Sequence, residues 1–405
     1  MSGASDLHAS APPRESRLAR ADTETRSDFG IYIHWPYCAR KCPYCDFNSH
    51  VRSGIDEAGW TEAIVRELEW TADWQGADRP LVRTVFFGGG TPSLMRGQSA
   101  GAVLNAIARL WPVANDVEIT LESNPASVEA ARFADYAAAG INRVSLGVQA
   151  LNDADLKFLG RLHDVAEAKA ALAIAMQNFG RVSLDLIYAR PKQTHGQWRA
   201  ELAEALAFGT EHLSLYQLTI EPATPFAALA RTGALAIPDD DTAAALYEIT
   251  QELTGAANRP AYEISNHAAP GAECRHNLLY WRYGAYAGAG PGAHGRLDAG
   301  GKRIATACEK LPERWRERVL RDGHGHAEFT PIDDAEAARE HLLMNLRLAE
   351  GLDLAVYRAR WGAAPGLARI AELERGGFLK TNESRIAVTP KGRLVLNRLI
   401  EMLCD

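Results

Sequence analysis

Residues 34–47 read HWPYCARKCPYCDF and place three cysteines, Cys38, Cys42 and Cys45, within eight residues. Thiolates ligate zinc ions and iron–sulfur clusters, and a structural site of either kind normally takes four protein ligands. Three closely spaced cysteines can each hold one iron of a cubane cluster and leave the fourth iron open. By the reasoning that separates catalytic from structural zinc sites, an open position indicates a bound reactant.

The composition describes a globular protein. The chain has 405 residues, a length suited to one large α/β domain with a smaller one, and 47% of its residues are hydrophobic. Its net charge of -7 provides no basic footprint, so we do not expect nucleic acid as a partner. No apolar run reaches the roughly 18 residues that a membrane-spanning helix needs.

Residues 1–28 are polar and rich in alanine, serine and arginine. They lack the apolar core of a secretory signal, and their acidic residues argue against a transit peptide, so we expect a disordered tail. Beyond the cluster, the remaining cysteines are scattered at Cys274, Cys308 and Cys404. This usage fits a reducing cytoplasm rather than a disulfide scaffold.

Short β-rich apolar runs alternate with longer segments of helical period over the first two thirds of the chain. We expect strands at 30–35, 84–90, 116–123, 143–150, 181–190 and 212–220. We expect the helices that follow them at 57–74, 98–111, from 127, 152–178, 195–208 and 239–255. Six such β-α units predict an α/β fold with a parallel sheet curled into a partial (β/α)6 barrel over residues 29–257.

The unusual residues of this barrel region follow its predicted strands. The cysteines follow the first strand, GGGTPS ends the second, ESNP ends the third and GVQ ends the fourth. In a barrel of this type the carboxyl ends of the strands form one face, where sites are built. The sequence therefore predicts that these motifs converge on one mouth.

The pattern changes after residue 257. Residues 258–330 are rich in glycine, histidine and aromatic residues and are expected to connect the barrel to a second domain. Residues 331–405 begin with a helical stretch and end with a helix, a Gly-Gly turn, two short strands around Asn382-Glu383 and a last helix. This order resembles a small α+β winged-helix module, and the acidic balance of the chain favours a packing or lid role over DNA binding.

The Cys-x3-Cys-x2-Cys spacing resembles that of the radical S-adenosylmethionine superfamily, and Tyr44 fills the aromatic position before its last cysteine. The superfamily's open iron chelates the amino and carboxylate groups of the cofactor's methionine, and one electron then cleaves a carbon–sulfur bond to release a deoxyadenosyl radical. Residues 88–92, GGGTP, resemble the glycine-rich element that hydrogen-bonds the methionine amino group. Glycine suits this place because the backbone must approach a ligand closely.

Two alternatives compete with this reading. The glycine run could bind phosphate, but the Gly-Lys-Ser/Thr ending of a phosphate-binding loop is absent. The cysteines could hold zinc with His50 or Asp46 as a fourth ligand. The context disfavours zinc, because the cysteine loop closes the first predicted strand and the glycine loop closes the second.

Several ordered motifs together resemble the family of the oxygen-independent coproporphyrinogen III oxidases, from about Phe29 to the C-terminus. They read YIHWPYCARKCPYCDF, FFGGGTPS, LESNP, RVSLGVQ, LGRLH and DLIYARPKQT. The resemblance implies a 4Fe-4S cluster on the three cysteines. It also implies S-adenosylmethionine contacts from Tyr32, Tyr44, Gly89, Gly90, Thr91, Glu122, Gln149, Arg161, Asp185 and Gln217. Taken alone, Arg161 could form a surface salt bridge, and Asp185 could cap or pair structurally.

The branch of the family is indicated by two features. The true oxidases carry a further cysteine two residues after the third, where this chain has Phe47. The CDFNS run instead resembles the HemW branch, the haem chaperones. Residues 276–281, HNLLYW, match the His-Asn-x-x-Tyr-Trp motif of that branch.

This second match implies haem binding by His276, Asn277, Tyr280 and Trp281. Imidazole is a common axial ligand of haem iron, and aromatic rings can stack on a porphyrin, so His276 is the candidate ligand. The alternatives are a structural histidine that holds a loop by hydrogen bonds, and a thiolate ligand from Cys274. No role is assigned to His267 and His294.

Two functions follow from the resemblance. In the first, a cytoplasmic protein takes up haem and hands it to haem-requiring respiratory proteins, at the membrane surface if its acceptors reside there; a homodimer fits this reading. In the second, a radical enzyme oxidatively decarboxylates the propionates of coproporphyrinogen III. Phe47 and the His-Asn-x-x-Tyr-Trp motif both favour the first.

Overall fold

The computed structural model describes residues 28–362, 365–382 and 384–404. The expected tail at residues 1–28 lies outside the described residues, except for Asp28, with which the first strand begins.

One sheet of eleven strands organises the larger part of the molecule, in the order β11-β10-β9-β8-β1-β2-β3-β4-β5-β6-β7. Its six parallel central strands are β1 (Asp28–Trp35), β2 (Leu81–Gly89), β3 (Val113–Ser123), β4 (Arg143–Gln149), β5 (Arg181–Tyr188) and β6 (His212–Gln217). The strand order does not return from β6 to β1, so the barrel is partial. This confirms the predicted (β/α)6 barrel.

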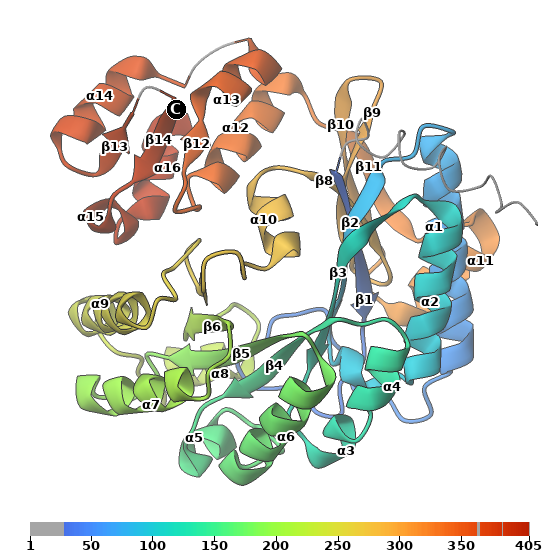
Figure 1. The fold of residues 1–405 in the computed structure, drawn as a ribbon, viewed down its shortest axis with the longest axis horizontal. Helices are drawn as coiled ribbons and strands as arrows, with labels where there is room; N and C mark the ends of the chain where they lie inside the picture. The colour runs from blue at the N-terminus through green and yellow to red at the C-terminus, as the bar shows by residue number, and fades with distance from the viewer. Residues whose placement is uncertain (1–27, 363–364, 383, 405) are drawn as a thin grey trace, which may run out of the picture.

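Two short helices, α5 (Asp153–Phe158) and α8 (Pro225–Arg231), lie near the cysteine-bearing segment, where the Phe226 N–H donates to the Pro43 carbonyl at 3.0 Å and Phe158 packs on Phe226. The other crossover helices cover the outer face of the curved sheet (Figure 1). They are α1 (Glu57–Gln75), α2 (Gly97–Leu110), α3 (Ser127–Ala130), α4 (Phe133–Ala138), α6 (Val165–Asn178), α7 (His195–Ala207) and α9 (Asp240–Ala256). The outward side chains of the strands are apolar and fully buried under these helices, as Phe29, Ile31 and Ile33 of β1 illustrate. Because side chains alternate along a strand, the other half of the residues faces the concave side.

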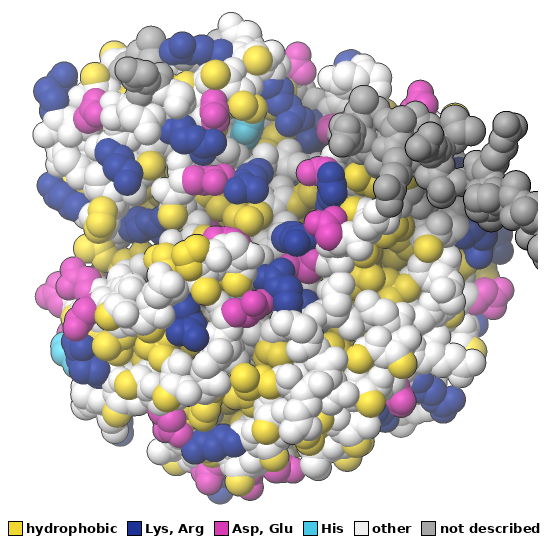
Figure 2. All heavy atoms as spheres, viewed as in Figure 1, with side chains coloured by type: hydrophobic (Ala, Val, Ile, Leu, Met, Phe, Trp, Pro, Cys, Tyr) yellow, Lys and Arg dark blue, Asp and Glu magenta, His cyan; other side chains and the backbone are white. Residues whose placement is uncertain are grey.

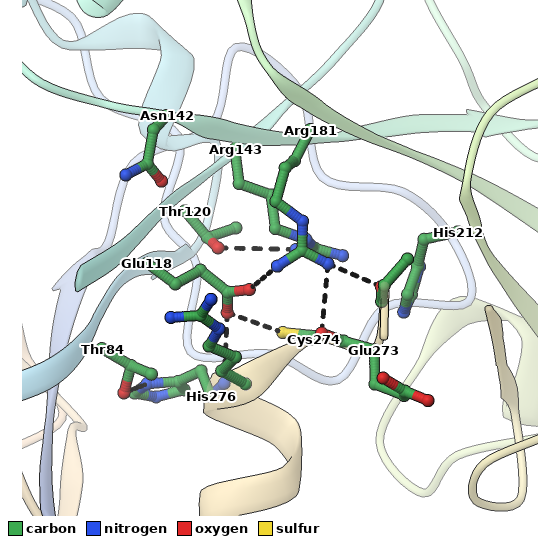
Figure 3. Close-up of polar contacts among 12 residues, drawn as sticks. Thr84, Glu118, Thr120, Asn142, Arg143, Arg181, His212, Glu273, Cys274 and His276 are labelled. Carbon is green, nitrogen blue, oxygen red and sulfur yellow. Dashed lines mark hydrogen bonds and ion pairs between the residues drawn. The ribbon is translucent and has the colours of Figure 1, made fainter. Parts of the chain in front are cut away.

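The concave side is polar, in contrast to the outer side. Figure 3 shows Thr84, Glu118, Arg143, Arg181 and His212 gathered there, facing the helix α10 (Arg275–Trp281). The strands therefore read as amphipathic: their apolar faces build the core, and their polar faces line the space where a site can form.

The segment 258–330 adds five strands to the same sheet. They are β7 (Asn266–Ala268), β8 (Ala285–Ala289), β9 (His294–Ala299), β10 (Lys302–Cys308) and β11 (His326–Pro331). β8 runs parallel to β1, whereas β9, β10 and β11 are antiparallel to their neighbours. The sequence analysis treated this region as a connection, because its short glycine-rich runs conceal the alternation of a strand.

The C-terminal region forms a smaller α+β unit with its own apolar core, as expected. Its sheet has the order β12 (Leu352–Asp353), β14 (Arg385–Val388), β13 (Leu379–Thr381), and its helices are α12 (Asp334–Asn345), α13 (Leu354–Trp361), α14 (Leu367–Arg375), α15 (Pro390–Arg393) and α16 (Leu396–Cys404). The two strands predicted around Asn382 are β13 and β14. α10 lies between this unit and the concave side of the large sheet (Figure 1).

Ion pairs join the two units at their boundary. Arg296 of β9 contacts Glu340 of α12 at 2.8 Å, and Arg282 contacts Glu350 at 2.8 Å. On the face drawn in Figure 2, basic and acidic side chains interleave in this region. The Arg282–Glu350 pair is exposed and stabilises little, whereas the side chains of Arg296 and Glu340 are only 25% and 26% exposed.

Glu67 fastens the outer helix α1 to the strand extension. Its buried carboxylate accepts hydrogen bonds from the backbone N–H groups of Gly290 (2.8 Å) and Gly325 (2.6 Å), from Trp315 Nε1 (3.0 Å) and from the Cys308 thiol (3.4 Å). Burial raises the pKa of Glu67, and the donors oppose that rise. The residue connects α1 with the turn after β8, with β10 and with α11 (Pro312–Asp322).

Glu67→Gln is expected to destabilise the protein by ~2 kcal/mol. The side-chain amide replaces one accepting oxygen with an NH2 group, which cannot accept hydrogen bonds from the buried donors that face it. Urea denaturation measures the change. Glu69→Gln is the matched control, since Glu69 lies on the same helix and forms an exposed pair with Arg109. Equal stability of the two variants would contradict the role given to Glu67.

Candidate functional site

The cysteine loop leaves β1 and folds back on itself. The Cys38 N–H donates to the His50 carbonyl at 3.0 Å, and the Cys45 N–H donates to the Cys42 carbonyl at 3.2 Å. All three cysteines are half-buried free thiols. The loop therefore presents three thiols at the carboxyl end of β1, as the sequence analysis expected.

The positions of the thiols bear on whether the loop holds a zinc ion or an iron–sulfur cluster. A single zinc ion with Zn–S bonds of about 2.3 Å draws its sulfur ligands to within about 4.6 Å of one another. Among the residues that the structure describes, the group of ligand atoms that meets a limit of 4.8 Å is Glu67, Cys308 and His326, and the three loop cysteines do not form such a group. Three thiols on one loop can each ligate a different iron, so the donor set fits a cubane cluster.

The proposed completing ligands of a zinc site are also not directed at the thiols. His50 Nε2 is hydrogen-bonded to Asn48 Oδ1 at 3.3 Å, and Asp46 is exposed. The geometry thus disfavours the zinc alternative.

The glycine loop after β2 packs directly on the cysteine loop. Gly89 has φ +108°, and a Cβ there would lie 2.6 Å from the His34 ring; a Cβ on Gly90 would lie 2.6 Å from the Tyr37 carbonyl oxygen. Thr91 ends the turn, and its hydroxyl donates to Cys38 Sγ at 3.3 Å. Glycine is required here by the close approach of two loops as well as by backbone conformation.

Arg161 lies at the centre of the site. Its Nη1 approaches Cys42 Sγ at 3.5 Å, its Nη2 donates to the Gly147 carbonyl at 2.8 Å and to Asn124 Oδ1, and its Nε is buried without a partner. These contacts exclude the alternative of a surface salt bridge. The orphaned Nε is a donor that an anionic group of a bound cofactor could satisfy.

Asn124 is a site residue that the sequence analysis did not single out, although it belongs to the ESNP motif. Its side-chain amide donates to Thr91 Oγ1 at 3.3 Å while its Oδ1 accepts from Arg161. Its backbone N–H donates to Glu129 at 3.0 Å. Asn124 therefore connects the loops after β2, β3 and β4, and the motif was the only signal that could have identified it.

Two carboxyl groups, Glu122 of β3 and Asp185 of β5, belong to the polar concave face. Burial, together with the charge of Asp185, raises the pKa of Glu122 to about 8. Asp185 accepts hydrogen bonds from Ser145 (2.9 Å) and Ser183 (3.4 Å), and burial raises its pKa as well. The carboxyl of Glu122 therefore changes between its acid and carboxylate forms near neutral pH. A cationic group bound beside it would favour the carboxylate form.

The remaining predicted cofactor residues differ in how closely they join the site. The Tyr32 hydroxyl donates to His34 Nδ1 at 3.1 Å, and Tyr44 packs near Phe226 with ring centroids 6.3 Å apart. Gln149 ends β4 in the left-handed region, with φ 75°. Gln217 is exposed at the end of β6, and no described residue hydrogen-bonds its side chain.

His276 lies in the first turn of α10, at the far end of the concave side. It is 1% exposed, and both ring nitrogens are hydrogen-bonded, Nδ1 to Thr84 at 2.8 Å and Nε2 to Tyr280 at 2.7 Å. Its backbone N–H donates to Glu118 at 3.2 Å (Figure 3). Burial lowers the pKa of the ring to about 3. This is the environment of a structural histidine, so haem contact by His276 stays a prediction that the geometry does not favour.

The other motif residues also face neighbouring protein groups. Asn277 Nδ2 donates to the Tyr262 hydroxyl at 3.3 Å, Tyr280 packs on Tyr286 with ring centroids 4.3 Å apart, and the Arg347 guanidinium lies 6.0 Å from the Trp281 ring. Cys274 is buried, and burial raises the pKa of its thiol to about 12. A thiol held in its protonated form is a poor metal ligand.

A network of charges closes this end of the concave side (Figure 3). Arg181 pairs with Glu118, which also accepts from the Cys274 thiol at 3.5 Å, and Arg181 donates to the Ala272 carbonyl at 2.6 Å. The network ties β3 and β5 to the start of α10.

No helix within the described residues is long and apolar enough to cross a lipid bilayer.

Comparison with known proteins agrees with this geometry. Residues 32–205 match the radical SAM superfamily, and residues 332–395 match the HemN C-terminal domain. The haem chaperone HemW of Escherichia coli is 36% identical over 380 residues, which cover 92% of this chain and 97% of that protein. The mitochondrial radical S-adenosyl methionine domain-containing protein 1 of Bos taurus is 37% identical over 381 residues, which cover 91% of this chain and 86% of that protein.

A solved structure shares the fold. The coproporphyrinogen III oxidase HemN of Escherichia coli superposes with a TM-score of 0.79 and covers 96% of this chain and 92% of that chain. The two sequences are 21% identical. At that identity the likeness concerns the architecture of the barrel and the C-terminal unit.

Replacing Cys38, Cys42 and Cys45 together by alanine is expected to abolish bound iron and sulfide after anaerobic reconstitution, because each iron would lose its protein ligand. Iron and sulfide analysis and the visible absorbance of the cluster measure this. Cys404→Ala serves as a control, since Cys404 lies in α16 of the C-terminal unit. A triple variant with full iron content would contradict the assignment.

Glu122→Gln is expected to change the pH dependence of stability in the cofactor-free protein. A carboxyl whose folded pKa is about 8 and whose ordinary value is 4.5 makes the folded state lose stability as pH rises between these values. The glutamine variant lacks this loss, so its stability relative to the wild type should be greater at pH 8.5 than at pH 5.5. Urea denaturation at the two pH values is the test, and a pH-independent difference would refute it.

Proposed function

The chain belongs to the radical SAM protein family that includes the HemW haem chaperones, and from this premise we propose that it binds haem and delivers it to haem-requiring respiratory proteins. The observation that supports this proposal most is the cysteine loop, which presents three thiols and has no further cysteine. Phe47, at the place of the oxidases' additional cysteine, is 59% exposed beside Cys45. Within the described chain, the remaining cysteines lie in β10, before α10 and in α16.

We assign a 4Fe-4S cluster to Cys38, Cys42 and Cys45, and S-adenosylmethionine to the mouth beside them. When bound, this pair supplies one-electron chemistry at an open iron. The chain's own part is electrostatic: Arg161 sets a fixed positive charge 3.5 Å from Cys42 Sγ, and Thr91 donates to Cys38 Sγ. Burial raises the pKa of the Cys38 thiol, and the Thr91 hydrogen bond and the Arg161 charge oppose that rise, which favours the thiolate that binds metal.

The two ends of a methionine group find complementary partners at this mouth. The carboxyl of Glu122, whose pKa of about 8 leaves it ready to ionise beside a cation, suits the ammonium. The unpartnered Nε of Arg161 suits the carboxylate. The glycine loop packs closely on the cysteine loop because no side chain intervenes, which brings its backbone to the same mouth.

An oxidative decarboxylase is the second candidate, because the HemN structure has the same architecture. In that reading the same site would act on the propionates of coproporphyrinogen III. The absence of a fourth cysteine near the loop weighs against it.

The two functions are separated by one anaerobic experiment. Reconstituted protein receives reductant and S-adenosylmethionine with coproporphyrinogen III in one arm, and haem in the other. We expect stoichiometric haem uptake, haem transfer to an apo-form of a haem-requiring respiratory protein, and no vinyl product. Conversion of coproporphyrinogen III over multiple turnovers would overturn the chaperone proposal.

We further propose that the protein works in the cytoplasm and meets its acceptors at the membrane surface, with a homodimer as one form. Within the described chain the cysteines form no disulfide, which is compatible with a reducing compartment. In this proposal the acceptor, and not this chain, provides the membrane attachment.

Arg161→Ala is expected to weaken S-adenosylmethionine binding by about 10- to 100-fold, since a charge-assisted hydrogen bond contributes roughly 1.5–3 kcal/mol. Equilibrium dialysis of anaerobic, iron-replete protein measures the affinity. Lys157→Ala removes an exposed charge from nearby α5 and is the control. An iron-replete Arg161→Ala variant with unchanged affinity would show that another residue holds the cofactor carboxylate.

A further inference from the structure

His294 stands at the same edge of the sheet as the cysteine loop. β8 runs parallel to β1, so the turn after β8 lies beside the loop that follows β1. The Asn48 side chain joins the two, donating to the Pro291 carbonyl at 2.9 Å and to the Lys310 carbonyl at 2.8 Å. His294 begins β9 directly after this turn.

The side chain of His294 belongs to the concave face. Leu297 of the same strand is 1% exposed and lies in the core of the outer face. Since side chains alternate along a strand, His294 and Arg296 share the opposite face. Arg296 confirms this, because it pairs with Glu340 of the C-terminal unit at 2.8 Å. His294 therefore faces the space that the cysteine loop, the concave sheet and the C-terminal unit border.

The imidazole of His294 is available to a ligand. The residue is exposed, and no described residue hydrogen-bonds either ring nitrogen. Partial burial of the ring, together with the charges of Arg296 and Lys310, lowers its pKa, which favours the neutral form that binds metals.

The other described histidines are less suited. His34, His212 and His276 are buried with both ring nitrogens hydrogen-bonded. His163, His267, His326 and His341 are also buried, His50 is bonded to Asn48, and His324 packs on Trp70. His195 is exposed, but it begins α7 on the outer layer. Among the described histidines, His294 is therefore the one whose ring is available to bind a ligand on the concave side.

The surroundings of His294 match an apolar ring that carries carboxylates. Phe47 of the cysteine loop and Leu311 are 59% and 39% exposed, although both are large apolar residues. Lys310 precedes Leu311 and is exposed, and Lys41 is exposed on the cysteine loop. Apolar surface for a macrocycle and ammonium groups for its propionates therefore occur on the segments that border His294.

We propose that His294 is the axial ligand that this protein offers to haem iron. The inference rests on the haem binding proposed above, and it moves the ligand from the motif that forms α10 to the mouth at the cysteine loop. The macrocycle would then lie against Phe47, with its propionates toward Lys310 and Lys41. The His-Asn-x-x-Tyr-Trp motif would instead hold α10 in position.

The test compares ferric haem titrations of anaerobically prepared wild-type protein, His294→Ala, His276→Ala and His195→Ala, followed by the Soret band and by electron paramagnetic resonance. We expect at least a 10-fold loss of affinity and a shifted Soret band for His294→Ala only. Added imidazole should restore the wild-type spectrum to His294→Gly, and His294→Met should bind haem with a different Soret position.

The outcomes distinguish the two proposals. If the wild type takes up no haem, the proposed function and this inference both fail. If the wild type binds haem and His294→Ala leaves affinity and spectrum unchanged, the inference fails alone and the proposed function remains. Loss of binding in His276→Ala, with a normal iron content and unchanged binding in His294→Ala, would return the ligand to the motif. The iron content and urea stability of each variant show whether it is misfolded. If His294→Ala is misfolded, the imidazole rescue of His294→Gly decides whether the ligand is assigned correctly.

Discussion

The guanidinium of Arg161 joins the ends of three strands at the mouth of the barrel. It reaches the thiol of Cys42 after β1, the amide oxygen of Asn124 after β3 and the carbonyl of Gly147 in β4. A buried cation must be satisfied by such partners, so its cost is offset only when all of these loops take their native positions together. The mouth is therefore ordered by the protein itself, and its thiols experience a fixed positive charge.

The barrel, and the meeting of its polar motifs at one edge, could be predicted because both follow from local patterns. Strand-length apolar runs and helical periods alternate along the chain, and the polar motifs follow the strands, so topology alone brings them to one edge. The eleven-stranded extent of the sheet was not predictable in this way. β8 reads AYAGA, and its pairing with β1 depends on residues about 250 positions away, which leave no periodic signal.

The His-Asn-x-x-Tyr-Trp motif, which forms α10, shows the opposite limit. Its sequence identified a branch of the family, yet burial and hydrogen bonding decide what its histidine can do. His276 is satisfied by Thr84, 192 positions earlier in the chain, and by Tyr280 of its own helix. A sequence can mark such a residue as important but cannot say whether its ring points to a ligand or into the protein. Asn124 illustrates the same limit, since its contacts come from separate loops.

Gln149 has a consequence of a different kind. Its φ of 75° lies in a region that β-branched residues enter only at considerable cost, whereas glycine and asparagine enter it readily. Backbone geometry therefore limits which residues this position tolerates, whether or not a ligand binds there. A mutational scan for abundance alone would report valine or isoleucine as depleted here, and such depletion would be mistaken for selection on chemistry.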